Sequence, residues 1–303
     1  MRGVFVDANG SLAAIFERQE KAGDPPVSVN RNADLAPDQM PAALDGAEIA
    51  IIDHTALPTD VARRCIGLKH VVFLGTGARS YMNPDELAEL GITVHLIRGY
   101  GDTAVAEATI ALMWAAARGI TQMDREMRQG QWLREDGMQL TGKTLGLIGF
   151  GGIAAEVARI ALGSGMRVIA WNRSPKPFAG VDFVDIYTLL AHSDVVSLHL
   201  LLNDETHGFL SRERIAAMKP RAILVNTARG LLVDEAAMIE ALQSGQIRHA
   251  ALDVFNIEPL PADHPLTKLP NVTLSAHSAF RTPEASENLI AAAWEHCRRI
   301  ART

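Results

Sequence analysis

The chain has 303 residues, 48% of them hydrophobic and 21% charged, and a formal net charge of −6. This length predicts about two domains with buried cores, and the acidic balance argues against nucleic acid as a general partner. The longest apolar stretch, 104–117, contains Glu107 and is too short to span a bilayer. No signal segment precedes the first apolar strand, and the two distant cysteines, Cys65 and Cys297, read as free buried thiols. We therefore expect a cytoplasmic protein without a metal site or membrane contact.

The first third of the chain alternates between short apolar strands and helices. Segment 32–41 contains two prolines and is predicted to be a surface loop. One long helix is predicted over 102–129. The remaining elements of this part are strands at 3–6, 27–29, 49–52, 71–74 and 92–96, and helices at 11–21, 60–65 and 85–90.

The rest of the chain repeats the alternation with strands that are continuously apolar. Such strands are typical of a parallel sheet whose two faces are both covered by helices. The centre of the chain is therefore predicted to be a doubly wound parallel sheet of the α/β class. Its strands are predicted at 144–150, 167–171, 195–200, 222–226, 250–254 and 272–275, and the helices at 211–218, 234–243 and 283–302.

The segment after the strand 144–150 indicates a dinucleotide site. Gly149 allows a tight turn, Gly151 allows the backbone to approach a pyrophosphate, and Ala154 allows the following helix to pack on the strand. The start of that helix, at Gly152 and Ile153, presents free N–H groups and a positive dipole end to the phosphates. Strand, glycine turn, helix and second strand follow one another at the expected spacing, which favours dinucleotide binding over an ordinary glycine-rich turn.

The end of the second strand bears on the choice between NAD and NADP. A carboxylate about 20 residues after the glycines normally binds the ribose 2′-hydroxyl of NAD. Here that position is Asn172, followed by Arg173 and Ser174, so that a guanidinium and a hydroxyl are available for a 2′-phosphate. An arginine that simply points into solvent is the alternative. We predict NADP as the preferred cofactor, with NAD possible.

Three later strand ends carry the candidate catalytic residues Arg229, Glu258 and His277. Ligands of an open α/β sheet lie outside the carboxyl ends of its strands, so these side chains are expected to meet over the nicotinamide. Reduction of a 2-keto acid needs such a set. Arg229 can bind the substrate carboxylate and polarise the keto oxygen, His277 can protonate that oxygen, and Glu258 can orient His277 and favour its charged form.

Each candidate also has a simpler interpretation, as a surface arginine, a solvated glutamate or a turn histidine. Their shared position after strand ends downstream of a dinucleotide loop favours the functional interpretation. Thr227 is assigned to the cofactor site as well. Asp253 is placed either to bond the nicotinamide carboxamide or to cap a turn.

Several motifs follow one another along the chain in a characteristic order. They are V-A-E at 105–107, L-x-G-K-T at 140–144, G-M at 165–166, S-D-V-V-x-L-H at 193–199, M-K-P at 218–220, N-x-x-R-G at 226–230 and D-V-F-x-x-E-P at 253–259. With these motifs the chain resembles the D-isomer-specific 2-hydroxyacid dehydrogenases, including glyoxylate and hydroxypyruvate reductases, over almost its full length. Departures from the family pattern, such as Ala154, Leu201 and Ser278, leave the expected chemistry intact.

The resemblance implies a Rossmann-type cofactor domain at 99–282 and a flavodoxin-like substrate domain formed by 1–98 and 283–303. It implies that Arg229, Glu258 and His277 are the catalytic trio. It also implies a homodimer packed chiefly through the cofactor domain. The substrate carboxylate would be held by backbone N–H groups of Leu74, Gly75, Thr76 and Gly77, where the glycines permit close approach.

The resemblance leaves the substrate open. A small acid such as glyoxylate or hydroxypyruvate is preferred here, ahead of a larger 2-keto acid. Glu258 argues against a formate-oxidising relative, which would pair its histidine with Gln, and Arg79 and Arg98 are the only basic candidates for a phosphoglycerate-type pocket. From a different class, a dinucleotide-binding sensor or corepressor-like module without turnover is the alternative function.

Overall fold

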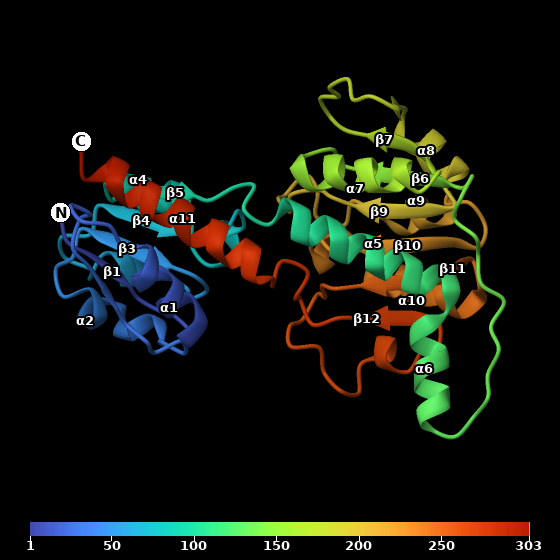
Figure 1. Cartoon of the computed structure of the whole chain (residues 1–303), viewed down its shortest axis with the longest axis horizontal. Helices are drawn as coiled ribbons and strands as arrows, with labels where there is room; N and C mark the ends of the chain where they lie inside the picture. Colours follow the sequence, from blue (N-terminus) through green and yellow to red (C-terminus); the bar gives the residue numbers. More distant parts are fainter. Residues whose placement is uncertain (303) are drawn as a thin grey trace. The chain divides into compact units, whose positions relative to one another are not determined.

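The computed structural model describes residues 1–302 and divides the chain into two compact units. One unit comprises Met1–Gly101 together with the C-terminal segment from Arg281, and the other comprises Asp102–Phe280 (Figure 1). The domain boundaries expected from sequence, after residues 98 and 282, lie 3 and 2 residues from these. Residue 303, the end of the predicted second segment, lies outside the described residues. The binding role of each unit stays a prediction.

The first unit is built around a five-stranded sheet in the order β2-β1-β3-β4-β5, with every neighbouring pair parallel. This is the flavodoxin-like order, so the predicted fold of this unit is confirmed. Helices α1 (Gly10–Gln19) and α11 (Pro283–Ile300) pack on one face, and α2 (Met40–Leu44), α3 (Thr59–Ala62) and α4 (Pro84–Glu89) on the other. The strands are β1 (Gly3–Phe5), β2 (Val27–Val29), β3 (Ile49–Ile52), β4 (His70–Phe73) and β5 (Thr93–Leu96).

The C-terminal helix α11 is attached to this unit by an aromatic contact. Trp294 is 1% exposed and stacks on Phe16 of α1 with ring centroids 4.2 Å apart. Its indole N–H donates to the backbone oxygen of Phe16 at 3.0 Å, which satisfies the one polar group of a buried tryptophan. The segment 32–41, predicted as a loop, instead contains a 3₁₀ turn (Pro37–Gln39) and the start of α2, because Pro37 and Pro41 occupy first-turn positions where a missing N–H costs nothing.

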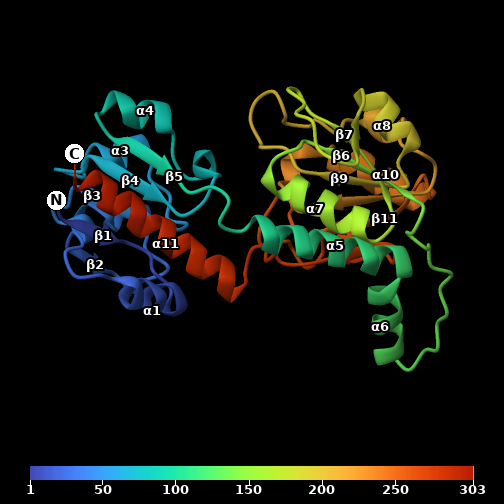
Figure 2. The ribbon, with the colours of Figure 1, turned by 45° about the horizontal axis from the view of Figure 1, so that its top comes forward.

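The second unit contains a seven-stranded sheet in the order β12-β11-β10-β9-β6-β7-β8, also parallel throughout. Helices α5 (Asp102–Arg118) and α7 (Gly152–Gly163) cover one face, while α8 (Ile186–His192), α9 (Arg212–Ala216) and α10 (Glu235–Ser244) cover the other (Figure 2). The predicted doubly wound, Rossmann-type sheet is confirmed. Its strands are β6 (Thr144–Ile148), β7 (Arg167–Trp171), β8 (Val181–Phe183), β9 (Val195–Leu198), β10 (Ala222–Asn226), β11 (Ile247–Leu252) and β12 (Val272–Leu274).

The prediction of one long helix over 102–129 is wrong. The structure has two helices, α5 (Asp102–Arg118) and α6 (Ile120–Arg128), separated by Gly119 with φ +62°. A left-handed residue ends an α-helix, and glycine adopts that conformation without a steric penalty. Residues of α6 are all at least partly exposed, and this helix projects away from the sheet of its unit in both views (Figures 1 and 2).

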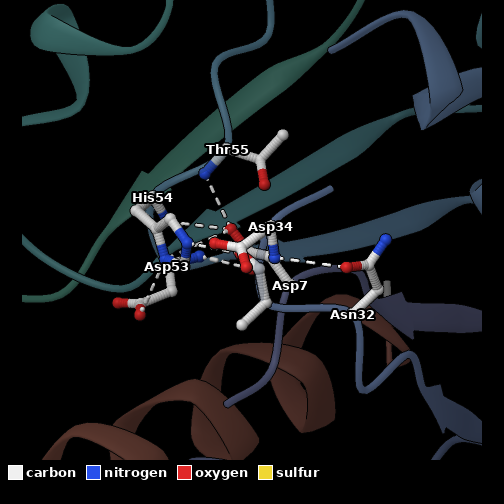
Figure 3. A network of polar contacts seen from close by, with 7 residues as sticks. Asp7, Asn32, Asp34, Asp53, His54 and Thr55 are labelled. Atoms are coloured by element: carbon white, nitrogen blue, oxygen red, sulfur yellow. Dashed lines mark hydrogen bonds and ion pairs between the residues drawn. The ribbon is translucent and has the colours of Figure 1, made fainter. Parts of the chain in front are cut away.

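A polar network orders the loops after β1 and β3 in the first unit (Figure 3). The fully buried carboxylate of Asp7 accepts backbone N–H bonds from Asp53, His54 and Thr55 at 2.9, 2.8 and 2.7 Å. The ring of His54 bonds the Asp53 carboxylate at 3.1 Å and the backbone oxygen of Ala33 at 2.6 Å. The hydrogen bond with Asp53 and the charge of Asp7 outweigh burial and raise the pKa of His54 to about 9.

The raised pKa predicts a pH-dependent contribution to stability. A histidine whose folded pKa exceeds its unfolded value stabilises the fold fully below about pH 6.5, and that stabilisation is lost as pH rises through about 9. We expect His54→Gln to lower the free energy of unfolding by about 1 kcal/mol at neutral pH, a value discounted because the ring is half exposed. Urea unfolding of both proteins near pH 7 and near pH 10 would measure this, and an equal difference at the two pH values would contradict it.

Candidate active site

The glycine turn between β6 and α7 has a shape that allows a ligand to approach its backbone closely. Gly149 has φ +90°, and a Cβ there would come within 2.6 Å of the backbone oxygen of His199. Gly151 caps the helix, and a Cβ placed on it would have no atom of the chain within 4 Å. The turn therefore leaves open space above Gly151 and directs the N-terminus of α7 towards it, which fits a bound pyrophosphate.

Asp102, the first residue of α5, lies against this turn. A Cβ on Gly152 would come within 1.9 Å of its Oδ2 atom, so that only glycine fits there without moving the carboxyl group. Burial, reinforced by the nearby charge of Glu156, raises the pKa of Asp102. Ile153, the other predicted contact at the start of α7, packs partly buried against the core below.

The side chains after β7 are held by hydrogen bonds. The amide of Asn172 accepts from the backbone N–H of Phe150 at 3.3 Å and donates to the backbone oxygen of Ser174 at 2.9 Å. Arg173 forms an ion pair of 2.6 Å with Glu205, which follows β9. Sequence reasoning missed Glu205, because its position 32 residues away gives no signal of the pairing.

His199 at the end of β9 is a second group that sequence reasoning treated only as part of a motif. Its Nε2 lies 2.9 Å from the hydroxyl of Ser197, and burial lowers its pKa to about 4. The imidazole is therefore neutral at physiological pH. Its backbone oxygen is the atom that excludes a side chain from Gly149.

Thr227 and Asp253 directly follow the strands β10 and β11. The hydroxyl of Thr227 is 2.8 Å from that of Thr109 on α5. Asp253 is 1% exposed, and its carboxylate accepts the backbone N–H groups of Ser278 and Ala279 at 3.0 Å each and the hydroxyl of Ser275. Of the two roles considered for Asp253, the structure displays the capping of a turn.

Arg229 lies in a segment after β10 that is held in place by side-chain hydrogen bonds. The Asn226 side chain donates to the backbone oxygen of Arg229 at 2.9 Å and accepts from the N–H of Ala228 at 3.0 Å. A Cβ on Gly230 would come within 2.1 Å of the backbone of Phe255, so this segment packs directly on the one that leads to Glu258. Among residues 1–302, the guanidinium bonds only the neighbouring backbone oxygen of Ala228, at 2.7 Å.

Glu258 and His277 form a close pair. His277 Nδ1 is 2.6 Å from one carboxylate oxygen of Glu258, and the other accepts the N–H of Phe255 at 2.9 Å. His277 has φ +47°, held by its N–H bond to the backbone oxygen of Asp253 at 2.8 Å. Within residues 1–302 no hydrogen-bond partner occupies Nε2. An imidazole oriented through Nδ1 with Nε2 available is the arrangement of a general acid.

The predicted substrate loop 74–77 belongs to the first unit, at the carboxyl end of β4. Gly75 donates its N–H to the backbone oxygen of Phe73 at 2.8 Å, and its own oxygen accepts from Ile97 at 3.1 Å. Neither Thr76 nor Gly77 donates its backbone N–H to another group of the described chain. Those two N–H groups, rather than the one of Gly75, are available to an anion. Leu74 is buried beneath them.

Among residues 1–302, no group of three or more His, Cys, Asp or Glu side chains is arranged to hold a metal ion. No helix in this range is long and apolar enough to cross a membrane.

Known proteins resemble this chain over most of its length. Residues 110–279 match the NAD binding domain of the D-isomer specific 2-hydroxyacid dehydrogenase family. A glyoxylate reductase of Aeropyrum pernix is 42% identical over 67% of this chain and 67% of its own. A hydroxypyruvate reductase of Thermotoga maritima is 36% identical over 84% and 85%. The structure of an acyclic imino acid reductase in complex with NADPH and D-Arg superimposes with a TM-score of 0.87 at 30% identity, covering 100% and 97%.

The chain therefore belongs to the D-isomer specific 2-hydroxyacid dehydrogenase family. It is an oxidoreductase of that class, which confirms the predicted family, fold and enzyme class, and the comparisons give no support to a sensor without turnover. A nicotinamide dinucleotide as cofactor is also confirmed. Two D-3-phosphoglycerate dehydrogenases match as well, but the chain spans only 47% and 49% of their lengths.

The geometry of the glycine turn predicts the effect of Gly149→Ala. The new methyl group would meet the backbone of His199, and alanine is disfavoured at φ +90°. We expect the free energy of unfolding to fall by about 2 kcal/mol or more and dinucleotide affinity to fall at least about tenfold. Gly163→Ala, at the far end of α7 where no atom lies within 4 Å of the added Cβ, is the matched control. Equal NADH affinity in the two variants would disprove the close-approach argument.

Proposed function

We propose that this protein reduces a small 2-keto acid, glyoxylate or hydroxypyruvate, reversibly to the D-2-hydroxy acid. The observation that carries the proposal is the 2.6 Å bond between His277 and Glu258, with Nε2 of the histidine available and Arg229 on the adjoining strand-end segment. Relatives named glyoxylate reductase and hydroxypyruvate reductase support the choice of substrate.

The roles of the residues follow from their chemistry. A bound nicotinamide dinucleotide supplies or accepts the hydride. Arg229 binds the substrate carboxylate and draws electron density from the keto oxygen. His277 gives the proton on Nε2 to that oxygen as the carbon accepts the hydride, so that one C–H and one O–H bond form. Glu258 holds the imidazole ring in place through its contact with Nδ1. In the reverse direction His277 accepts the same proton.

The binding roles are part of the same proposal. The turn residues Gly149, Gly151 and Gly152 would hold the pyrophosphate, since the cradle around Gly151 is open. The first unit would bind substrate, with the N–H groups of Thr76 and Gly77 receiving the carboxylate. NADP is proposed as the preferred cofactor because the residues directly after β7 include Arg173 and Ser174, with Asn172 in place of the usual carboxylate, and an NADPH complex exists for a protein of similar structure.

A homodimer is proposed from the surface of the second unit. Helix α6 has no buried residue, and Ile120, Met127 and Trp132 in and beside it are 52%, 55% and 75% exposed. Large exposed apolar side chains in and beside one helix favour an interface there. Sedimentation is expected to give about twice the 32.7 kDa chain mass, and a value at 32.7 kDa would reject the dimer.

The two buried free thiols suit the reducing cytoplasm that we propose as location.

The catalytic assignment predicts the behaviour of His277→Ala. Loss of a general acid lowers kcat by about 10²- to 10⁴-fold, whereas dinucleotide affinity should stay within about twofold, because the ring acts on the substrate. Initial rates of NADPH oxidation with glyoxylate and hydroxypyruvate, beside a fluorescence titration of NADPH, measure both. His192→Ala, an exposed histidine at the end of α8, serves as control. Undiminished turnover in His277→Ala would refute the assignment.

A further inference from the structure

The loops on either side of the glycine turn are joined by one ion pair. In the sheet, β7 and β9 are the two neighbours of β6, the strand that leads into the turn. Arg173 follows β7 and Glu205 follows β9, and their side chains meet at 2.6 Å. They are 79% and 72% exposed, so the pair lies at the surface where a ligand can reach it.

The turn that carries Glu205 is well ordered by local hydrogen bonds. The side-chain oxygen of Asn203 accepts the backbone N–H groups of Glu205 and Thr206, both at 3.0 Å. The hydroxyl of Thr206 donates to the backbone oxygen of Leu201 at 2.6 Å. An asparagine that bonds its own backbone two residues on is a standard way to fix a turn. Glu205 is therefore presented to Arg173 by a built turn, not by a freely moving loop.

Two ligands would use this pair in opposite ways. A 2′-phosphate needs the Arg173 guanidinium, and it would have to displace the Glu205 carboxylate and withstand its negative charge. A ribose 2′-hydroxyl can instead donate to a carboxylate, which is the usual contact for NAD and is missing at Asn172. The pair thus combines a phosphate-binding cation with an acceptor for the unphosphorylated ribose.

We propose that Glu205 determines cofactor specificity by competing with the 2′-phosphate for Arg173, so that the enzyme accepts NADH as well as NADPH. This inference rests on the proposed binding of the dinucleotide beside Arg173. An exposed ion pair is weak, so the phosphate can break it, and the expected effect is a matter of several-fold and not of orders of magnitude. Glu205 is a positioning residue for Arg173 and takes no part in the hydride or proton transfer.

The test compares dissociation constants of NADPH and NADH in the full-length enzyme at fixed low salt, measured by fluorescence titration. Glu205→Gln is expected to bind NADPH about three- to tenfold more tightly, with NADH unchanged or about twofold weaker. Asp204→Asn, the adjacent exposed residue with the same loss of charge, is the matched control and should shift both cofactors equally and less. Selective tightening in Glu205→Gln but not in Asp204→Asn supports the inference, and equal ratios in the two variants overturn it.

Arg173→Gln separates this inference from the proposed cofactor preference. In that background the gain from Glu205→Gln should vanish, because the carboxylate acts through Arg173. If Arg173→Gln weakens NADPH while Glu205→Gln changes nothing, Arg173 binds the phosphate and the role of Glu205 is rejected. If Arg173→Gln leaves NADPH affinity unchanged, both the NADP preference and the role of Glu205 fail. NADH-dependent reduction of a keto acid would still test the proposed reaction by itself.

Discussion

The arrangement of the candidate active site depends on the buried carboxylate of Asp253. Its two bonds to the N–H groups of Ser278 and Ala279, and the bond from Ser275, fix the loop after β12. That loop holds His277 at φ +47°, a left-handed conformation that costs a non-glycine residue about 1–2 kcal/mol. A carboxylate buried without such donors would be strongly disfavoured, so the loop and the carboxylate require each other. The result is that His277 meets Glu258 at 2.6 Å.

The first unit uses the same device. Asp7, at the carboxyl end of β1, accepts three backbone N–H groups from the loop after the neighbouring strand β3. In each unit, a buried aspartate that follows one strand accepts backbone N–H groups from the loop that follows the neighbouring parallel strand. Because all strands of each sheet run in the same direction, these loops gather at one edge, and the functional groups gather with them. The chemistry is thus a consequence of parallel topology combined with buried capping carboxylates.

Much of this could be read from the sequence. Continuous apolar runs and the glycine turn at Gly149 predicted the sheet of the second unit and the phosphate loop, because burial on two faces and a left-handed turn leave strong local patterns. The flavodoxin-like sheet of the first unit was predicted from the family resemblance. Contacts between segments that are distant in the sequence leave no local pattern. The pair of Arg173 with Glu205 and the partial burial of His199 come from strand order, and the strand β8 was not predicted. Gly119 was visible in the sequence, but a single glycine within a helical pattern does not by itself predict the end of a helix.

Asp253 shows what the structure adds to the prediction from sequence. Its position after a strand suggested either a cofactor contact or a turn cap, and only the positions of Ser278 and Ala279 display the capping role. Arg229, Glu258 and His277 could be predicted as a set because each of them follows a strand end, and this shared position follows from topology alone. The side chains of the keto acid pocket do not share such a rule, so substrate choice rests on relatives and on experiment.

The most direct test of the proposed reaction is the product formed from hydroxypyruvate and NADPH, or NADH, by the wild-type enzyme. Chiral chromatography of the reaction mixture distinguishes D-glycerate from L-glycerate while the loss of reduced cofactor is followed by absorbance. We expect stoichiometric formation of the D-isomer. Formation of the L-isomer, or binding of the cofactor without turnover of any small 2-keto acid, would contradict the proposed reaction.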